Sequence, residues 1–525
     1  MAKGRRLQPG MFGFRKRQRN DTGGQSGQSQ PRPLPAKLAD SLQQIRQEFH
    51  DASDLVVKQF CIGGIAARKA AVLYLEGMAD GKAVKEAVIE PLMLWARPQL
   101  GGGALRGNLP EQIRQRLSPA QNMINLHSMQ EVAEQLLEGN SVLLVDGFSV
   151  ALGTENRGFP KRAVEAPETE VVVRGPREGF TEVVRDSVAL VRRRLKTPGL
   201  VVEQMRVGRR SVTDVRLLYL AGVARPELVR EVRRRVQAID VDMAPESGII
   251  EQLISDYLLW LFPLIQSTER PDTVAASLAE GRVALLVDHS PFALIMPNTL
   301  FQFFSTAEDY YQQYLVSLML RLIRLGAFAI STFITAIYIA SSSFHQELIP
   351  LPLLLNIAAS EAGVPFPLPI TAVAIELLLE VLREAGIRLP RQVGQAVSIV
   401  GAIVLGQAAV QAGFASAGLV IVAALGTIAS FAIPNFEAAV AVRLLRFPFI
   451  LLASVLGFYG LFLGAVILLF YLSSLQCFGV PFLSSGRALM LSSYDPWTRS
   501  PVRPYAPRER IRQATPPRRR QGSDR

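Results

Sequence analysis

Residues 55–79, "LVVKQFCIGGIAARKAAVLYLEGMA", and residues 200–224, "LVVEQMRVGRRSVTDVRLLYLAGVA", are two versions of one phrase. They align without a gap and share the opening Leu-Val-Val and a Leu-Tyr-Leu near the end. A second phrase also occurs twice, as "EGNSVLLVDGF" at 138–148 and "EGRVALLVDHS" at 280–290. Since both phrases recur in the same order, the sequence predicts two copies of one unit, over about 54–158 and 199–297.

Each copy has the pattern of an α/β unit. β-branched and aromatic runs broken by glycine indicate strands, and apolar residues at three- and four-residue steps indicate helices. In the first copy we expect strands at 55–60 and 71–77, helices at 82–95 and 129–139, and closing strands from 141. Gly139 and Gly281 stand where a glycine ends a helix. Asp146 and Asp288, at the strand ends, are interpreted as turn formers, with ligand binding as the alternative.

Signals for catalysis are poor. The stretch "GMADGK" at 77–82 has three residues between its glycines, whereas a phosphate-binding loop needs four. None of the four histidines pairs with cysteine or acid at metal-ligand spacing, and no G-x-S-x-G occurs. The sequence therefore predicts no enzyme, no metal site and no cofactor.

Between the copies, "RGPREGFTEVVRDSVALVRRRLKTPGL" at 174–200 predicts a helix with three consecutive arginines. A solvated face or an interdomain linker is the default interpretation. The alternative is a contact with another subunit, for which the candidates are Arg177, Glu178, Arg192, Arg193, Arg209 and Arg210.

The second half of the chain is apolar. Charged residues become scarce between Leu325 and Leu475, and a helix needs about 20 apolar residues to cross a bilayer. We expect spans beginning at Leu325 and Ile370, two more within 392–436 with a turn at 413–418, and a final run at 447–474. The intervening segment 348–369 is short and rich in proline, which indicates a re-entrant or surface segment.

Arginines near the expected span ends indicate orientation. They are Arg321, Arg324, Arg383, Arg388, Arg391, Arg443 and Arg446. Placing them in the cytosol agrees with a chain start that lacks the apolar region of a signal peptide, so the N-terminal half is expected in the cytosol. The run 447–474 is either one span, which exports the C-terminal tail, or two spans or a hairpin hinged near 457–464, which keep it in the cytosol. The arginines of the tail favour the cytosolic placement.

Glu376 and Glu380 are the most informative charges. They lie four residues apart, so one helix face carries both. A carboxylate inside a membrane is costly and indicates function, and copies arranged around an axis would form acidic rings that line a cation pore. The alternative is that Glu380 pairs with Arg383 and marks the cytosolic interface.

The formal net charge of +12 comes largely from arginine-rich ends. Both ends also contain Pro, Gly, Gln or Ser, so we interpret them as disordered tails. Contact with membrane lipids is favoured over nucleic acid, because no nucleic-acid-binding motif accompanies the charge.

The sequence thus predicts a duplicated cytosolic α/β domain of two similar subdomains, followed by an all-α, multi-span transmembrane domain. The expected boundaries are a tail at 1–50, a first subdomain at 51–170, a helix or linker at 171–200, a second subdomain at 201–310, a transmembrane domain at 315–480 and a tail at 485–525.

Five longer motifs resemble a known family. They are "RGPREGFTEVVRDSVALVRRRLK", "GRRSVTDVRLLYLAGVA", "RPDTVAASLAEGRVALLVDHSPFALIMP", "RLPRQVGQAVSIVGAIVLGQAAVQAG" and "LRFPFILLASVLG". In this order they resemble the A subunits of GerA-type spore germination receptors, over about 54–483. The second copy keeps "GRRS" at 208–211, where the first has "GGIA" at 63–66.

The resemblance implies an inner-membrane protein of bacterial endospores. It implies two partners, a B subunit that resembles an amino-acid transporter and binds the nutrient, and a C-subunit lipoprotein. It also implies a homo-oligomer that acts as a nutrient-gated cation channel. The alternative is a non-conducting scaffold in the receptor complex. A secondary transporter is disfavoured, because the membrane half shows no clear inverted repeat.

Overall fold

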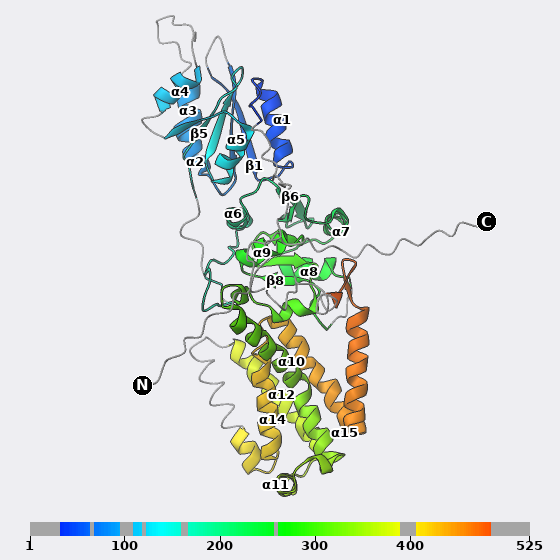
Figure 1. Ribbon diagram of the computed structural model, residues 1–525. Coiled ribbons are helices and arrows are strands. Elements are labelled where there is room, and N and C mark those ends of the chain that lie inside the picture. The colour runs from blue at the N-terminus through cyan, green and yellow to red at the C-terminus, as the bar shows by residue number, and fades with distance from the viewer. Residues whose placement is uncertain are drawn as a thin grey trace, which may run out of the picture.

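The computed structural model shows an elongated chain in three tiers (Figure 1). A first α/β unit lies at one end, a second lies in the middle, and a bundle of long helices forms the other end. The structure describes residues 32–62, 68–94, 109–117, 122–158, 166–167, 169–256, 261–388 and 406–484.

The first unit is an antiparallel sheet with helices on both faces, and its strands run in the order β1-β2-β4-β5-β3. Its elements are α1 (Leu38–Glu48), β1 (Leu55–Ile62), β2 (Arg68–Leu75), α2 (Gly81–Val84), η1 (Lys85–Ile89), α3 (Glu90–Leu94), α4 (Leu109–Leu117), β3 (Met123–Leu126), α5 (Met129–Leu137), β4 (Ser141–Val145) and β5 (Ala151–Thr154).

The second unit repeats this plan, with the strand order β6-β7-β9-β10-β8. Its elements are α6 (Val184–Arg194), β6 (Leu200–Val207), β7 (Thr213–Leu220), α7 (Pro226–Gln237), α8 (Ser247–Ile254), β8 (Gln266–Thr268), α9 (Pro271–Ala279), β9 (Val283–Val287) and β10 (Ala293–Met296). An α/β region followed by helices agrees with the predicted fold class.

The strand-end aspartates have a second role beside the one expected. Asp146 Oδ1 accepts the backbone N–H of Leu38 at 2.9 Å, at the start of α1. Asp288 Oδ1 accepts that of Val184 at 3.1 Å, at the start of α6. Neither helix has a side-chain cap of its own. Both aspartates stand in the turns that follow β4 and β9, as expected, and each also caps the first helix of its unit, where a carboxylate favours the helix dipole.

Two further expectations change with this finding. The expected tail at 1–50 is wrong for its last part, because α1 buries Leu38, Leu42 and Ile45 against the first sheet. Likewise α6 is the first helix of the second unit rather than a linker, since its apolar face belongs to that unit's core. The expected order of two strands, two helices and two strands also lacks β3 and β8, which are edge strands of four and three residues.

Both sheets are buried on their two faces, which explains the continuous apolar runs. Along β9, Val283, Leu285 and Val287 face one core, while Ala284 and Leu286 face the other. Successive strand residues point to opposite faces, so "VALLV" supplies both cores. Gly139 and Gly281 follow the preceding helices at φ +87° and +91°, which confirms their predicted place.

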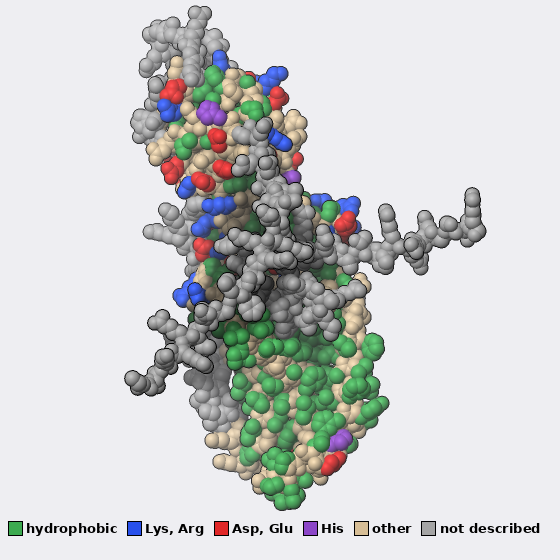
Figure 2. Space-filling view, in the orientation of Figure 1, with side chains coloured by type: hydrophobic (Ala, Val, Ile, Leu, Met, Phe, Trp, Pro, Cys, Tyr) green, Lys and Arg blue, Asp and Glu red, His purple; other side chains and the backbone are tan. Residues whose placement is uncertain are grey.

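The helical tier begins with two short 3-10 turns. Its elements are η2 (Leu300–Phe304), η3 (Ala307–Tyr310), α10 (Tyr314–Ser343), η4 (Gln346–Leu348), α11 (Leu351–Glu361), α12 (Leu368–Arg388), α14 (Ala417–Ser430) and α15 (Phe436–Ser474), followed by the hairpin strands β11 (Gln476–Cys477) and β12 (Val480–Pro481). Among the described residues, α10 and α15 are long and apolar enough to cross a membrane. Figure 2 shows that the visible face of this tier is mostly hydrophobic, whereas charged side chains gather on the α/β tiers.

The α15 segment folds back on itself at Gly457. This glycine has φ +61° and ψ −139°, outside the helical region, a combination open to glycine and strained for other residues. Beyond it, Gly464 packs against Leu452 and Phe449, as expected for two antiparallel arms. Both ends of α15 contact the second α/β unit, Glu437 through Ser267 and Tyr471 through Leu261. The hairpin alternative therefore describes this run.

Candidate functional site

Glu376 lies at the centre of the helical tier and is buried. Its side chain is 3% exposed. The carboxylate accepts hydrogen bonds from Arg446 Nη1 at 2.8 Å and from Thr335 Oγ1 at 2.8 Å. An ionised group far from water needs such partners, because an isolated charge in an apolar medium is very costly.

Arg446 connects four helices. From α15 it reaches Glu376 on α12, and its Nε and Nη2 donate to the backbone oxygen and hydroxyl of Ser331 on α10 at 2.7 and 2.8 Å. Nη2 also donates to the Gly426 carbonyl of α14 at 2.7 Å. All its nitrogens have acceptors, so this arginine fixes the positions of the helices around it.

A second ion pair lies one turn nearer the α/β units. Arg443 Nε donates to Glu380 Oε1 at 3.1 Å, and here the carboxylate is 44% exposed. Glu380 thus pairs with Arg443 on α15 rather than with Arg383 on its own helix. We call these two pairs, Glu376–Arg446 and Glu380–Arg443, the Glu–Arg ladder.

Small residues bring the helices close enough for this ladder. Fully buried Ala336, Ala372 and Ala423 lie on α10, α12 and α14. At Gly426, a Cβ would meet Ile334 at 3.0 Å and approach the Arg446 guanidinium. Small side chains at helix contacts are typical of membrane bundles, in which close backbone approach drives association.

Arg192, a subunit-contact candidate, is occupied within the chain. It is fully buried, and its guanidinium donates twice to Asp54 of the first unit, at 2.8 and 2.9 Å. Ser53 extends this contact, donating its N–H to the Val202 carbonyl and accepting from Arg216. We call the contacts of Asp54 and Ser53 with the second unit the upper joint.

The other subunit-contact candidates lie at the surface of the second unit. Arg177, Arg209 and Arg210 are exposed, the last two beside Asp240 and Asp242. Half-buried Glu178 pairs with Arg193 and Arg194. Their part in contacts between subunits stays a prediction.

The end of α15 is fixed to the second unit. Cys477 Sγ donates to the Leu264 carbonyl at 2.8 Å, and Phe478 N–H donates to Asp256, which also binds Arg235. Burial raises the pKa of the Cys477 thiol to about 12, so it stays a donor at neutral pH. Phe482 is fully buried beside Phe262 and Phe303.

These contacts are part of one continuous apolar core. It runs from strands of the second unit, such as Val215 and Val287, to membrane-helix residues such as Val442 and Phe449. We call this core together with the β11–β12 hairpin the lower joint. The second unit and the bundle are therefore tightly coupled.

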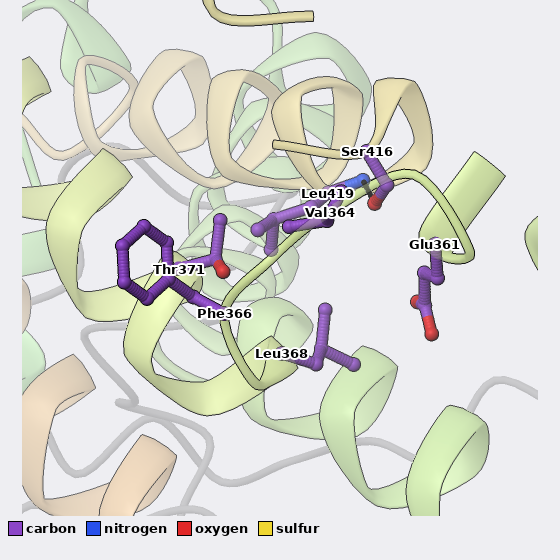
Figure 3. A pocket seen from close by; sticks show the side chains of 7 residues that line it. All are labelled: Glu361, Val364, Phe366, Leu368, Thr371, Ser416 and Leu419. Atoms are coloured by element: carbon purple, nitrogen blue, oxygen red, sulfur yellow. Dashed lines mark hydrogen bonds between the residues drawn. The ribbon is translucent and has the colours of Figure 1, made fainter. Parts of the chain in front are cut away.

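A small cavity lies at the opposite end of the bundle (Figure 3). It measures about 130 Å³ and is lined by Glu361, Val364, Phe366, Leu368, Thr371, Ser416 and Leu419. Tyr338 donates to Glu361 at 3.3 Å at this site. Ligand pockets for small organic molecules usually measure about 300–1,000 Å³, so this cavity is too small for a nutrient of that size.

Sequence reasoning found the two carboxylates but missed their partners. From the sequence, Arg443 and Arg446 are predicted only to mark orientation. The available signal for pairing is that the two arginines stand three residues apart and the two glutamates four residues apart. Spacing alone, however, does not predict which distant helices pair. No group of three or more His, Cys, Asp or Glu side chains could hold a metal in the part of the chain that the structure describes.

Two α/β units joined to a bundle that contains two candidate membrane helices define the class, a membrane protein with an α/β region before its helices. The family model "Bacillus/Clostridium GerA spore germination protein" matches residues 43–511, and the chain belongs to this family. The predicted family is confirmed.

Similar proteins come from Bacillus species. Spore germination protein KA of Bacillus subtilis (strain 168) is 41% identical over 88% of this chain and 84% of its own length. The uncharacterized membrane protein YfkQ of the same strain is 40% identical, covering 87% of each chain. Spore germination protein GerLA of Bacillus cereus is 36% identical over 86% of this chain and 90% of its own. Membership of a family of germination proteins agrees with the prediction that the chain is not an enzyme.

A solved structure is also similar. The N-terminal domain of the A subunit of the Bacillus megaterium spore germinant receptor GerK3 is 32% identical, with a TM-score of 0.39. The match covers 51% of this chain and 96% of that one.

Proposed function

We propose that this chain is the A subunit of a nutrient-germinant receptor in the inner membrane of the spore, and that several copies form a nutrient-gated cation channel. Its α/β units lie in the cytosol. Its partners are a B subunit that resembles an amino-acid transporter and binds the nutrient, and a C-subunit lipoprotein. The family and its named germination relatives support the role in germination.

The proposed architecture has two copies of one α/β unit and several membrane spans. The shared strand order, the paired aspartate caps and the sequence repeat support the duplication. The arms of α15 on either side of Gly457 are about 31 and 26 Å long at 1.5 Å per residue, and the hydrocarbon core of a bilayer is about 30 Å thick. The first arm is therefore long enough to span it, and the second, of 17 residues, is at the lower limit of length for a span.

The Glu–Arg ladder is the observation that carries the channel proposal. Ionisable groups at membrane depth are rare and usually belong to an ion path or a gate. In the described conformation both carboxylates are neutralised by arginines of α15. We assign this conformation to the closed state. Movement of the first arm of α15 would separate the arginines from α12 and expose an acidic face to cations.

The test uses Glu376→Gln in the receptor complex reconstituted into liposomes. Glutamine keeps one side-chain oxygen for Arg446 and turns its NH2 to the Thr335 hydroxyl, which can accept, but it removes the charge, so assembly should persist while cation conductance and selectivity change. Glu384→Gln is the matched control, because Glu384 lies on the same helix, is exposed and pairs only with Arg388 among the described residues. If both variants conduct like the unchanged complex, Glu376 is not part of the ion path.

The second candidate function is a non-conducting scaffold. The burial of Glu376 within one chain favours it, since a closed ion pair also serves as a purely structural contact. A purified chain that stays monomeric and passes no ions in liposomes would support the scaffold. Oligomers with nutrient-dependent flux in the complex would support the channel.

A further inference from the structure

The acidic face of α12 continues into an arginine. Glu376, Glu380 and Arg383 lie at steps of four and three residues, so one stripe of the helix carries all three. The first two positions meet Arg446 and Arg443 on α15. Four residues before Arg443 on α15 stands Ala439, which is buried and apolar and so offers no charge to a third step of the ladder. The Glu–Arg ladder therefore ends in a cation, Arg383, that forms no ion pair within the described residues.

The hydrogen bonds of Arg383 confirm that it is poorly satisfied. Its two Nη atoms share one acceptor, the hydroxyl of Ser430, at 3.3 Å each. Its Nε is buried and has no acceptor within the described part of the chain. The ring of Phe431 lies 4.6 Å from the guanidinium carbon. A guanidinium has five N–H donors, so most of its capacity for an anion is unused.

The sequence adds that the next segment cannot supply the anion. Residues 389–405 contain no aspartate and no glutamate. Arg383, Arg443 and Arg446 against Glu376 and Glu380 give three positive and two negative charges, which leaves one positive charge in this cluster. A cation at this depth is costly unless an anion is close.

The depth of Arg383 points to the phosphates of the lipid headgroups. It stands five residues before the end of α12, about 8 Å along the axis at 1.5 Å per residue. That end lies towards the second α/β unit. Glu380 of α12 pairs with Arg443 of α15, and Arg443 lies only six residues after Glu437, which contacts Ser267 of the second unit. The adjoining surface is apolar and exposed, with Val381 at 64% and Phe431 at 70%. Arg383 is thus at the boundary between hydrocarbon and headgroups.

We propose that Arg383 binds the phosphate of an anionic phospholipid in the leaflet next to the α/β units. The planar guanidinium can hold two phosphate oxygens at once, which a hydroxyl cannot replace. The surplus positive charge favours an anionic headgroup over a zwitterionic one. The inference rests on the membrane placement proposed above, and it is independent of whether the chain conducts ions.

The experiment compares full-length chain in phosphatidylcholine vesicles and in vesicles that also contain phosphatidylglycerol. The lipid that remains bound after gentle detergent extraction is measured by native mass spectrometry. Arg383→Gln should bind phosphatidylglycerol about tenfold more weakly, as expected for loss of hydrogen bonds to a charged group. The matched control is Arg388→Gln on the same helix end, where the arginine is exposed and paired with Glu384, and its binding should change less than about twofold.

Other outcomes overturn the proposal in distinguishable ways. Equal phosphatidylglycerol binding by Arg383→Gln and the unchanged chain removes the site. If inorganic phosphate stabilises the chain in phosphatidylcholine vesicles as much as phosphatidylglycerol does, the bound anion is a soluble one instead of a lipid. In Arg383→Lys, a carbodiimide crosslink between two copies identifies a carboxylate of a neighbouring subunit.

Two controls keep the test decisive. If Arg383→Gln fails to enter membranes, Arg383→Lys is used, and it should bind phosphatidylglycerol more weakly because lysine has no planar fork. Binding equal to that of the unchanged chain overturns the proposal. Failure of the unchanged chain to resist carbonate extraction contradicts the membrane placement itself, which separates that failure from loss of lipid preference alone.

Discussion

The two joints of the second α/β unit differ in construction. At the upper joint, the buried ion pair Asp54–Arg192 and the bonds of Ser53 hold the first unit, beside the smaller contacts of Arg185 with Glu76 and of Ala189 with the first core. At the lower joint, an apolar core and the β11–β12 hairpin spread the contact over many side chains. A concentrated polar joint can be opened by one change, whereas a distributed apolar joint resists single changes. The second unit is therefore expected to move with the bundle, and the first unit to move relative to both.

Breaking the upper joint should have the largest effect. Asp54→Ala leaves the Arg192 guanidinium buried without its counter-ion, and we expect a loss of about 3–5 kcal/mol. Hydrogen exchange of β1 and β6 in the full chain would report the loss. Combining Asp54→Ala with Arg192→Met should recover most of it, because the unpaired charge is gone. Glu48→Ala, at an exposed carboxylate of α1, is the control. Equal exchange in all variants would show that the pair does not hold the units together.

A single change at the lower joint should cost less. Phe482→Leu keeps an apolar side chain beside Phe262 and Phe303 and removes only part of its volume. We expect a loss of about 1–1.5 kcal/mol, in the range of core changes that nearly conserve volume. Thermal unfolding in detergent would measure it, with exposed Val171→Leu as control. A loss as large as that of Asp54→Ala would contradict the contrast between the joints.

The smallest effect is expected from a change of pH at residues 169–178, a segment that lies on the second unit between the two joints. Burial raises the pKa of Glu170 to about 7 from its ordinary 4.5, and its carboxyl group accepts from Thr268 at 2.6 Å. The folded state favours the protonated acid. Protection of residues 169–178 from proteolysis should therefore fall as the pH rises from about 4.5 to 7, and it should level off above pH 7. Proteolysis of the segment at several pH values would show this, and Glu170→Gln should flatten the profile. A profile that is unchanged in Glu170→Gln would assign the pH dependence to another group.

The sequence repeat predicted most of the α/β tier because it depends on local pattern. The runs at 55–79 and 200–224 give β1, β2, β6 and β7 at the expected places. What sequence reasoning missed depends on distant partners. Asp146 and Asp288 cap helices more than 100 residues earlier. Arg446 meets Glu376 across 70 residues. No periodicity records such contacts, because only the folded chain brings these residues together.

The aspartate caps have a consequence for the time course of folding. Helix α6 leaves the ribosome long before Asp288 is made, 104 residues later, so its first turn stays without this cap until β9 has formed. The same delay of 108 residues separates Leu38 from Asp146 in the first unit. Contacts so distant in sequence slow the search for the native state, since a long loop must close first. Each unit is therefore expected to become stable late and all at once, when its fourth strand joins the sheet, and the first unit should reach this point while the second is still being synthesised.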